Sequence, residues 1–189
     1  MGFEFIETNI EEAKKIIAKY PKDRSKSAIM GMLDLAQRQN NGWLSREAMD
    51  YVAQYLGIAS IRVYEVATFY TMYNLQPVGK FLVQVCTTTP CMLRGGEDIL
   101  NACKKYLKVD LDEITADEFF TIKEVECLGG CVNAPVVQIN DDYYEDLSSE
   151  RLIEILKILK SGRKVTCGSQ IGRKSSEPVI DNKIKESGL

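Results

Sequence analysis

Residues 83–96 read VQVCTTTPCMLRGG, and residues 125–135 read VECLGGCVNAP. The first stretch has two cysteines five positions apart, Cys86 and Cys91, and the second has two cysteines four positions apart, Cys127 and Cys131. Each pair follows an apolar run that is typical of a β-strand. We therefore expect the two pairs to meet at adjacent strand ends of one sheet.

The spacing of these cysteines argues against two common uses of paired thiols. Structural zinc sites usually have a C-x2-C knuckle in each half, and thioredoxin-type disulfides also need C-x2-C. Neither pair has that spacing. Two thiolate pairs could instead hold the two irons of a [2Fe–2S] cluster. The pattern is C-x4-C followed by C-x3-C, with 35 residues between Cys91 and Cys127, and it differs from the plant-type ferredoxin pattern.

Glycine and proline residues accompany both pairs. Gly129 and Gly130 lack β-carbons where the backbone must approach a cluster closely, and their amides are free to point at sulfur. Pro90 and Pro135 restrict the backbone next to the first pair and after the second. These neighbours favour a cluster over the alternative interpretation, in which the thiols are simply buried in a core.

The remaining two cysteines lack such neighbours. Cys103 lies in an amphipathic helical pattern, and Cys167 lies in a polar C-terminal segment. We predict that both are structural or incidental rather than ligands. A disulfide framework is not expected, because the N-terminal residues contain no secretory signal and thiols inside cells stay reduced.

The composition excludes several other classes of protein. The 189 residues include no histidine, which excludes zinc proteases, two-histidine zinc fingers, Rieske clusters, histidine-ligated haem and nucleophile–histidine pairs. The formal net charge of −3 gives no electrostatic reason to expect a nucleic-acid partner. No apolar run approaches the roughly 18 residues that a membrane helix needs.

The hydrophobic pattern changes near residues 76–79 and divides the chain. Upstream, a helical period predicts a small all-α module over residues 1–76. Ser45 is expected to cap one of its helices, which should end at Gly57. In the following helical pattern, Tyr70 is expected on the inner face.

Downstream, the order β-α-β-β-α predicts a sheet with mixed pairing, flanked by helices, over residues 77–162. The fold class predicted for the whole chain is therefore α+β. Residues 163–189 are polar and basic, without a hydrophobic period. We predict that they form an extended tail, without a core of its own, that binds a partner.

Three stretches together resemble a known family. VQVCTTTPCMLRGG, VECLGGCVNAPVVQINDDYYEDL and RVYEVATFYTMYNLQPVGK are similar to the small [2Fe–2S] subunit of NADH:quinone oxidoreductase, respiratory complex I. The resemblance covers about residues 20–175 and includes CGSQIGRKSSEP in the tail. It implies a helical N-terminal module followed by a thioredoxin-like ferredoxin domain. It also implies that one [2Fe–2S] cluster is ligated by Cys86, Cys91, Cys127 and Cys131.

The resemblance further implies a role in electron transfer. The cluster would exchange single electrons with the FMN of a partner subunit that binds NADH, next to a neighbouring iron–sulfur subunit of the peripheral arm. The location implied is the cytoplasmic face of the bacterial inner membrane, or the matrix side in an organelle. Two residues depart from those expected in relatives: Met92 stands in place of Trp, and Gly130 in place of Ala. Because these changes could alter the reduction potential, the resemblance implies no particular value for it.

Other functions fit parts of the sequence. The same domain could serve an NAD-linked hydrogenase or formate dehydrogenase, or be a free ferredoxin. Residues 44–70 also read like a helix-turn-helix, which with an iron–sulfur site would make a redox-sensing DNA-binding regulator. A recognition helix should offer polar side chains to bases, whereas residues 61–73 offer Arg62 and then mainly Tyr, Phe and Met. No independent catalysis is expected, because the chain has no nucleotide-binding glycine fingerprint and no evident acid–base pair.

Overall fold

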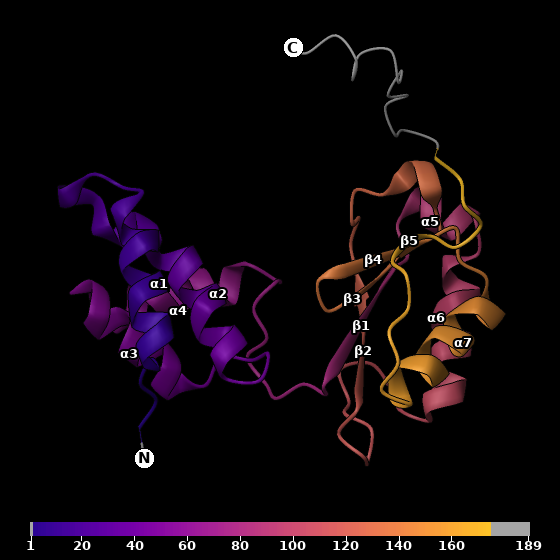
Figure 1. Ribbon diagram of the computed structural model, residues 1–189, viewed down its shortest axis with the longest axis horizontal. Helices are drawn as coiled ribbons and strands as arrows, with labels where there is room; N and C mark the ends of the chain where they lie inside the picture. Colours follow the sequence, from indigo (N-terminus) through magenta and orange to yellow (C-terminus); the bar gives the residue numbers. More distant parts are fainter. Residues whose placement is uncertain (1, 175–189) are drawn as a thin grey trace, which may run out of the picture. The chain divides into compact units, whose positions relative to one another are not determined.

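The hydrophobic residues of the chain form separate cores in two structural units, Met1–Lys80 and Phe81–Leu189 (Figure 1). The structure is a computed structural model that describes residues 2–174. Within those residues, no helix has both the length and the apolar character that crossing a membrane requires.

The N-terminal unit is helical, as its hydrophobic period predicted. Its buried core contains mainly aliphatic side chains, among them Met32, Leu33, Ala36, Val52 and Val63. The helices are α1 (Glu7–Ala18), the 3-10 helix η1 (Lys22–Ala28), α2 (Ile29–Gln39), α3 (Arg46–Leu56) and α4 (Ser60–Phe69).

The boundaries of α3 lie where the sequence placed them. The Ser45 hydroxyl accepts a hydrogen bond from the amide of Ala48 at 3.1 Å, and Gly57 ends the helix in the left-handed conformation. The expectation for Tyr70 was wrong. Helix α4 ends at Phe69, Tyr70 has extended backbone angles, and its side chain is exposed because the helical period no longer applies there.

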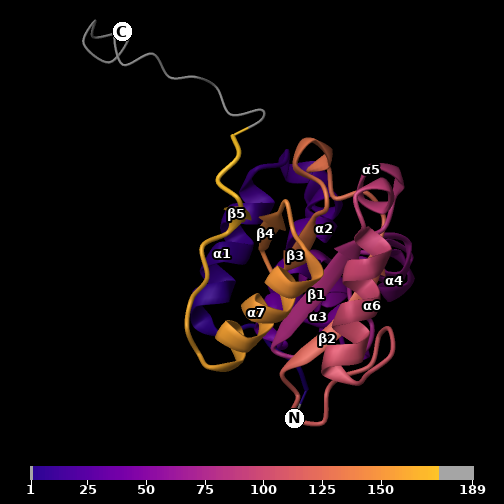
Figure 2. The ribbon, with the colours of Figure 1, turned by 90° about the vertical axis from the view of Figure 1, so that its right-hand side faces the viewer.

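The C-terminal unit is built on a five-stranded sheet with the order β2-β1-β3-β4-β5 (Figure 2). Strand β1 pairs in parallel with β2 and antiparallel with β3, so the predicted mixed pairing is confirmed. Strands β3 and β4 pair antiparallel and form a hairpin. The strands are β1 (Phe81–Cys86), β2 (Phe120–Val125), β3 (Val137–Ile139), β4 (Asp142–Glu145) and β5 (Gly168–Ser169).

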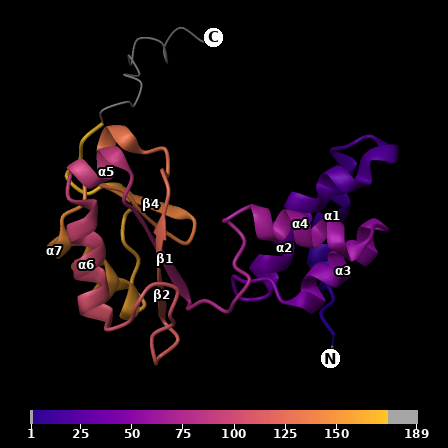
Figure 3. The same ribbon diagram turned by 180° about the vertical axis from the view of Figure 1, so that it is seen from behind.

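Two long helices, α6 (Gly96–Leu107) and α7 (Ser149–Lys160), lie side by side against one face of the sheet (Figure 3). Val83 and Val85 of β1 and Ile122 of β2 are buried with Leu152 and Ile155 of α7 in the same cluster. The α+β fold class is confirmed. Two short helices complete the unit, α5 (Thr89–Leu93) and the 3-10 helix η2 (Cys131–Asn133).

The first residues after α7 pack on the C-terminal unit. Val165 packs against the core of the C-terminal unit, and β5 pairs in parallel with β4. A strand of two residues held by backbone hydrogen bonds has no hydrophobic period, so the pattern could not reveal it. Residues 175–189 of the predicted tail lie outside the described residues.

Candidate metal centre

The four cysteines of the two pairs lie at or just after the carboxyl ends of the adjacent strands β1 and β2. Cys86 is the last residue of β1 and is in register with Val125, the last residue of β2. Cys127 follows two residues later. Cys91 lies in α5, directly after β1, and Cys131 begins η2, directly after the β2 loop. Because β1 and β2 are parallel, both loops leave the sheet at the same edge, as the sequence predicted.

The thiols are in contact within each pair, and the two pairs act on each other through their charges. The sulfur atoms of Cys127 and Cys131 are 3.4 Å apart, and the Cys91 thiol hydrogen-bonds Cys86. Cys86 is near enough to Cys127 and Cys131 for its charge to act on the pKa of each, and Cys131 acts on the pKa of Cys91 in the same way. The two pairs therefore form one electrostatic unit.

The first pair is buried and the second is exposed. Cys86 and Cys91 are 2% and 1% exposed, and they pack with Ala134 and Val136 in a small apolar cluster. Cys127 and Cys131 lie open at the surface. A cluster bound by all four would have one side embedded in protein and the other close to solvent or to a docked protein.

The buried pair contains one thiol that ionises easily and one that does not. Burial alone would raise the pKa of Cys86, but hydrogen bonds from Thr88, Cys91 and the amide of Leu128 outweigh it and lower that pKa. The Thr88 hydroxyl lies 3.2 Å from the Cys86 sulfur. For Cys91, burial and then the bond to Cys86 raise the pKa to about 12.

The exposed pair behaves in the same way. A hydrogen bond from the Gly129 amide, 3.4 Å from the sulfur, is the main cause that lowers the pKa of Cys127. The shared bond with Cys127 raises the pKa of Cys131. Each pair therefore holds one thiolate readily, and a second thiolate in each pair requires a positive ion to offset the repulsion.

The donor set fits a two-iron cluster better than a single metal ion. Among residues 2–174, no three His, Cys, Asp or Glu side chains converge tightly enough to hold one ion. A [2Fe–2S] cluster instead takes two thiolates on each iron, which is the arrangement that two separate thiol pairs offer. The chain's donors are soft thiols, which suit iron–sulfur chemistry.

Two glycines allow the loops to close around the sulfur atoms. Gly129 has a φ of +83°, and this left-handed turn directs its amide at Cys127, as the sequence suggested. Gly96, at the start of α6, is packed so closely that a β-carbon would lie 2.8 Å from the carbonyl oxygen of Cys86. The Tyr143 hydroxyl donates to the carbonyl oxygen of Leu128 at 2.7 Å and holds the second loop against the β3–β4 hairpin.

The other two cysteines lie elsewhere in the unit. Cys103 is buried in α6 within the main core, where burial raises its pKa to about 12. Cys167 is exposed just before β5. The prediction that neither is a ligand remains a prediction, and the two supply a buried and an exposed control for mutagenesis.

Sequence reasoning missed the polar residues that support the second loop. The backbone amide of Asp146 donates to the carbonyl oxygen of Asn133 at 2.7 Å, and Arg173 donates to the carbonyl oxygen of Val132 at 2.7 Å. Neither contact has a sequence signal, because each joins residues that are far apart in the chain, 41 positions in the case of Arg173 and Val132.

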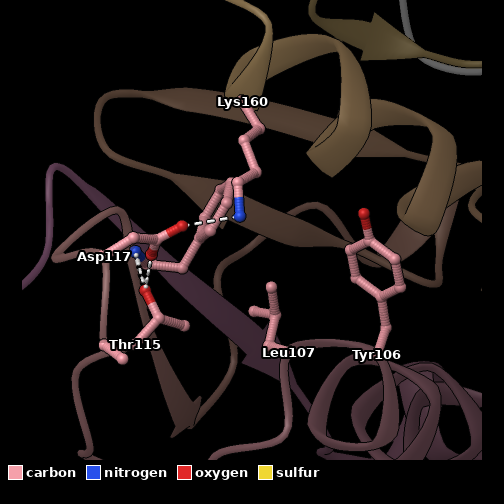
Figure 4. Close-up of a pocket in the computed structure, with 7 residues that line it drawn as sticks. Tyr106, Leu107, Thr115, Asp117 and Lys160 are labelled. Carbon is pink, nitrogen blue, oxygen red and sulfur yellow. Dashed lines mark hydrogen bonds and ion pairs between the residues drawn. The ribbon is translucent and has the colours of Figure 1, made fainter.

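A hollow of about 340 Å³ lies at the opposite end of β2 from the cysteines (Figure 4). Three of its polar side chains bond one another. Lys160 pairs with Asp117 at 2.6 Å, and the Thr115 hydroxyl donates to the same carboxylate at 2.6 Å. The charged groups of this hollow are thus paired with each other, and it contains none of the cysteines.

The helical pair α3–α4 does not present a surface suited to DNA. Arg62 is the one basic residue of α4, and its guanidinium bonds Glu65 at 2.9 Å. The exposed side chains of this region include Ile61, Phe69 and Met72, which are apolar. Base recognition needs free hydrogen-bonding side chains, so this surface favours contact with protein.

Comparison with known proteins fits these observations. The family model for the thioredoxin-like [2Fe–2S] ferredoxin matches residues 13–160. The chain belongs to this family. Membership indicates one [2Fe–2S] cluster, which agrees with the donor set at the ends of β1 and β2.

Relatives of this ferredoxin family place the chain within an oxidoreductase complex. It is 57% identical to an NADH-quinone oxidoreductase subunit of Rickettsia conorii, over 85% of this chain and 96% of that protein. It is 52% identical to the mitochondrial NADH dehydrogenase [ubiquinone] flavoprotein 2 of Dictyostelium discoideum, over 93% of this chain and 71% of that protein. The resemblance stated from the sequence is confirmed, and the chain is a component of an oxidoreductase complex.

A solved structure shares the ferredoxin family's fold at low sequence identity. The NAD+-reducing [NiFe]-hydrogenase in its H2-reduced state matches with a TM-score of 0.61 and 16% identity. The match covers 71% of this chain and only 23% of the hydrogenase chain. The likeness therefore establishes the fold and nothing about the reaction.

Proposed function

We propose that this chain is the electron-transfer subunit of an NADH–quinone oxidoreductase and that its cluster exchanges single electrons with the FMN of a partner subunit that binds NADH. The observation that carries the proposal is the meeting of two thiol pairs at one edge of the sheet. In the proposal the ligands are Cys86, Cys91, Cys127 and Cys131.

The two cysteine pairs would bind opposite sides of the cluster. When bound, the cluster supplies reversible one-electron transfer. Cys86 and Cys91 hold its inner side away from water, since both are nearly fully buried. Cys127 and Cys131 hold its outer side at the surface, where an electron has the shortest path to a docked partner. The Gly129 amide donates to sulfur and so stabilises negative charge on Cys127.

Apolar side chains beside the cysteines support docking at this edge. Met92 and Leu93 follow Cys91 and are 45% and 75% exposed, and Val132 follows Cys131 and is 56% exposed. Apolar side chains exposed next to a redox centre favour contact with another protein. We propose that the FMN-binding subunit docks here, with the neighbouring iron–sulfur subunit of the peripheral arm also in contact with the chain. The complex would lie at the cytoplasmic face of the bacterial inner membrane, or on the matrix side in an organelle.

A second candidate is the equivalent subunit of an NAD-linked hydrogenase, a class of enzyme with a chain of the same fold. The higher identity to the Rickettsia conorii protein, over nearly its whole length, favours the first proposal. Affinity capture of the chain from its native membranes distinguishes them. An NADH-oxidising flavoprotein recovered with quinone reductase activity supports the first, and recovery with hydrogenase activity supports the second.

Serine substitution tests the ligand set. The purified protein is expected to contain two irons and two acid-labile sulfides per chain, because a [2Fe–2S] centre requires them. Changing Cys86 or Cys127 to Ser should weaken or abolish the visible absorption. Cys103→Ser is the matched buried control and Cys167→Ser the matched exposed control, and both should keep the spectrum. Loss of colour in the controls, together with full colour in Cys86→Ser, contradicts the assignment.

A further inference from the structure

The segment after α7 returns along the sheet and ends beside the second cysteine loop. We call residues 165–173 the C-terminal strap. Its strand β5 pairs with β4, the Gln170 amide donates to the carbonyl oxygen of Glu145 at 3.0 Å, and Arg151 of α7 donates to the Gln170 side chain at 3.1 Å. The strap is therefore hydrogen-bonded to strand β4 and to helix α7 before it reaches the loop that carries Cys131.

At its end the strap meets a buried carboxylate. The Asp146 side chain is only 2% exposed, and it accepts hydrogen bonds from Arg173 and from the Ser169 hydroxyl, the latter at 2.7 Å. A buried carboxylate needs such partners, since burial without them would be costly. The guanidinium of Arg173 also bonds the carbonyl oxygen of Val132 at 2.7 Å.

These bonds fix the backbone immediately after Cys131. Arg173 holds the peptide of Val132, and the Asp146 amide holds the carbonyl oxygen of the next residue, Asn133. The loop that carries Cys131 is thus held at two successive carbonyl oxygens, by the Arg173 guanidinium and by the backbone amide of Asp146, and the side chains of these two residues form an ion pair. We call these contacts the clamp. The bond to Val132 places the charged pair of Arg173 and Asp146 one residue along the loop from Cys131.

We propose that Arg173 and Asp146 are positioning residues for the cluster, which fix the Cys131 loop and set the reduction potential by opposing charges. The proposal rests on the proposed function, because it takes Cys131 as a ligand. Adding an electron makes the cluster more negative, so a nearby cation favours reduction and a nearby anion disfavours it. Removing one partner therefore leaves the other charge uncompensated.

The two single variants should shift the potential in opposite directions. Arg173→Met leaves the Asp146 carboxylate unpaired and should lower the potential, whereas Asp146→Asn leaves Arg173 unpaired and should raise it. A change of about threefold in the reduction equilibrium corresponds to about 28 mV for one electron. Arg173→Lys should restore most of the wild-type value, and the double variant Arg173→Met/Asp146→Asn should lie near it. A merely structural role predicts shifts of one sign, or none.

A measurement on the metal-free chain separates this inference from the proposed function. Arg173→Met should raise amide hydrogen exchange at Asn133 and Ala134 about tenfold, because a charged hydrogen bond to the loop is lost. Arg163→Met is the matched control, since Arg163 lies in the same C-terminal segment and bonds Ser161 instead. Unchanged exchange in Arg173→Met, or potentials that shift alike in both single variants, overturns the inference. A colourless wild-type protein with faster exchange in Arg173→Met contradicts the ligand set and leaves the clamp standing.

Discussion

Replacing Gly96 with alanine should destabilise the domain, although alanine forms helices better than glycine. Gly96 is the first residue of α6, where the helix passes against the backbone of both buried cysteines. An added β-carbon would lie 2.8 Å from the carbonyl oxygen of Cys86 and 3.0 Å from that of Cys91. These are backbone atoms, so they cannot rotate away as a side chain could. The helix or the sulfur-bearing loop must move.

The magnitude follows from two opposing effects. Alanine gains at most about 1 kcal/mol over glycine inside a helix, and the gain is smaller at its first residue. Overpacking a closely packed site costs about 1–3 kcal/mol. Because the obstructed atoms are backbone, we expect the cost to prevail, with a net loss of about 1–2 kcal/mol in the free energy of unfolding. The same displacement should reduce the amount of cluster retained.

Urea unfolding of the metal-free chain measures the first effect, and visible absorption with iron content per chain measures the second. Gly130→Ala is the matched control. Gly130 has a φ of −87°, and an added β-carbon would lie 3.1 Å from a methyl group of Val136. A side chain can move by the few tenths of an ångström that this contact requires. Gly130→Ala should therefore remain near wild type. The reasoning is refuted if Gly96→Ala unfolds at the wild-type urea concentration and keeps a full cluster.

Three smaller changes test other parts of the structure. Tyr143→Phe removes the bond to the carbonyl oxygen of Leu128 and should cost about 0.5–1.5 kcal/mol in urea unfolding, with faster loss of colour. Ser45→Ala removes the cap of α3 and should cost about 1 kcal/mol, measured by thermal unfolding, while cluster content stays unchanged. The bond from Lys160, followed by that from Thr115, lowers the pKa of Asp117 to about 2, so its contribution to stability is present above about pH 4 and is lost as the pH falls towards 2. Asp117→Asn should reduce the pH dependence of the free energy of unfolding between about pH 4 and pH 2. An unchanged slope of that free energy against pH would contradict the pairing.

Much of the site could be predicted because its signals are local. Cys86 and Cys127 follow runs with strand character, so their places at the ends of β1 and β2 were accessible from sequence. Ser45 and Gly57 act through backbone chemistry within a few residues, and this made the limits of α3 accessible as well.

The remaining features depend on contacts between distant segments. The unequal burial of the two cysteine pairs follows from how Ala134 and Val136 pack on the first pair, which no local pattern encodes. Helix α5 has only five residues, which is too short for a helical period to show in the sequence. The clamp on the second loop joins Arg173 to Asp146 across 27 residues, and polar side chains give no periodic signal for such a pairing.

The placement of the thiols on two strands ties the loading of the proposed cluster to folding. No single segment of the chain supplies four sulfur atoms, since 35 residues separate Cys91 from Cys127. A chain in which β2 has not yet docked on β1 offers iron only half of a binding site. Metal capture would then draw the equilibrium towards the completed sheet, and withdrawal of iron would weaken the edge of the domain that carries the thiols.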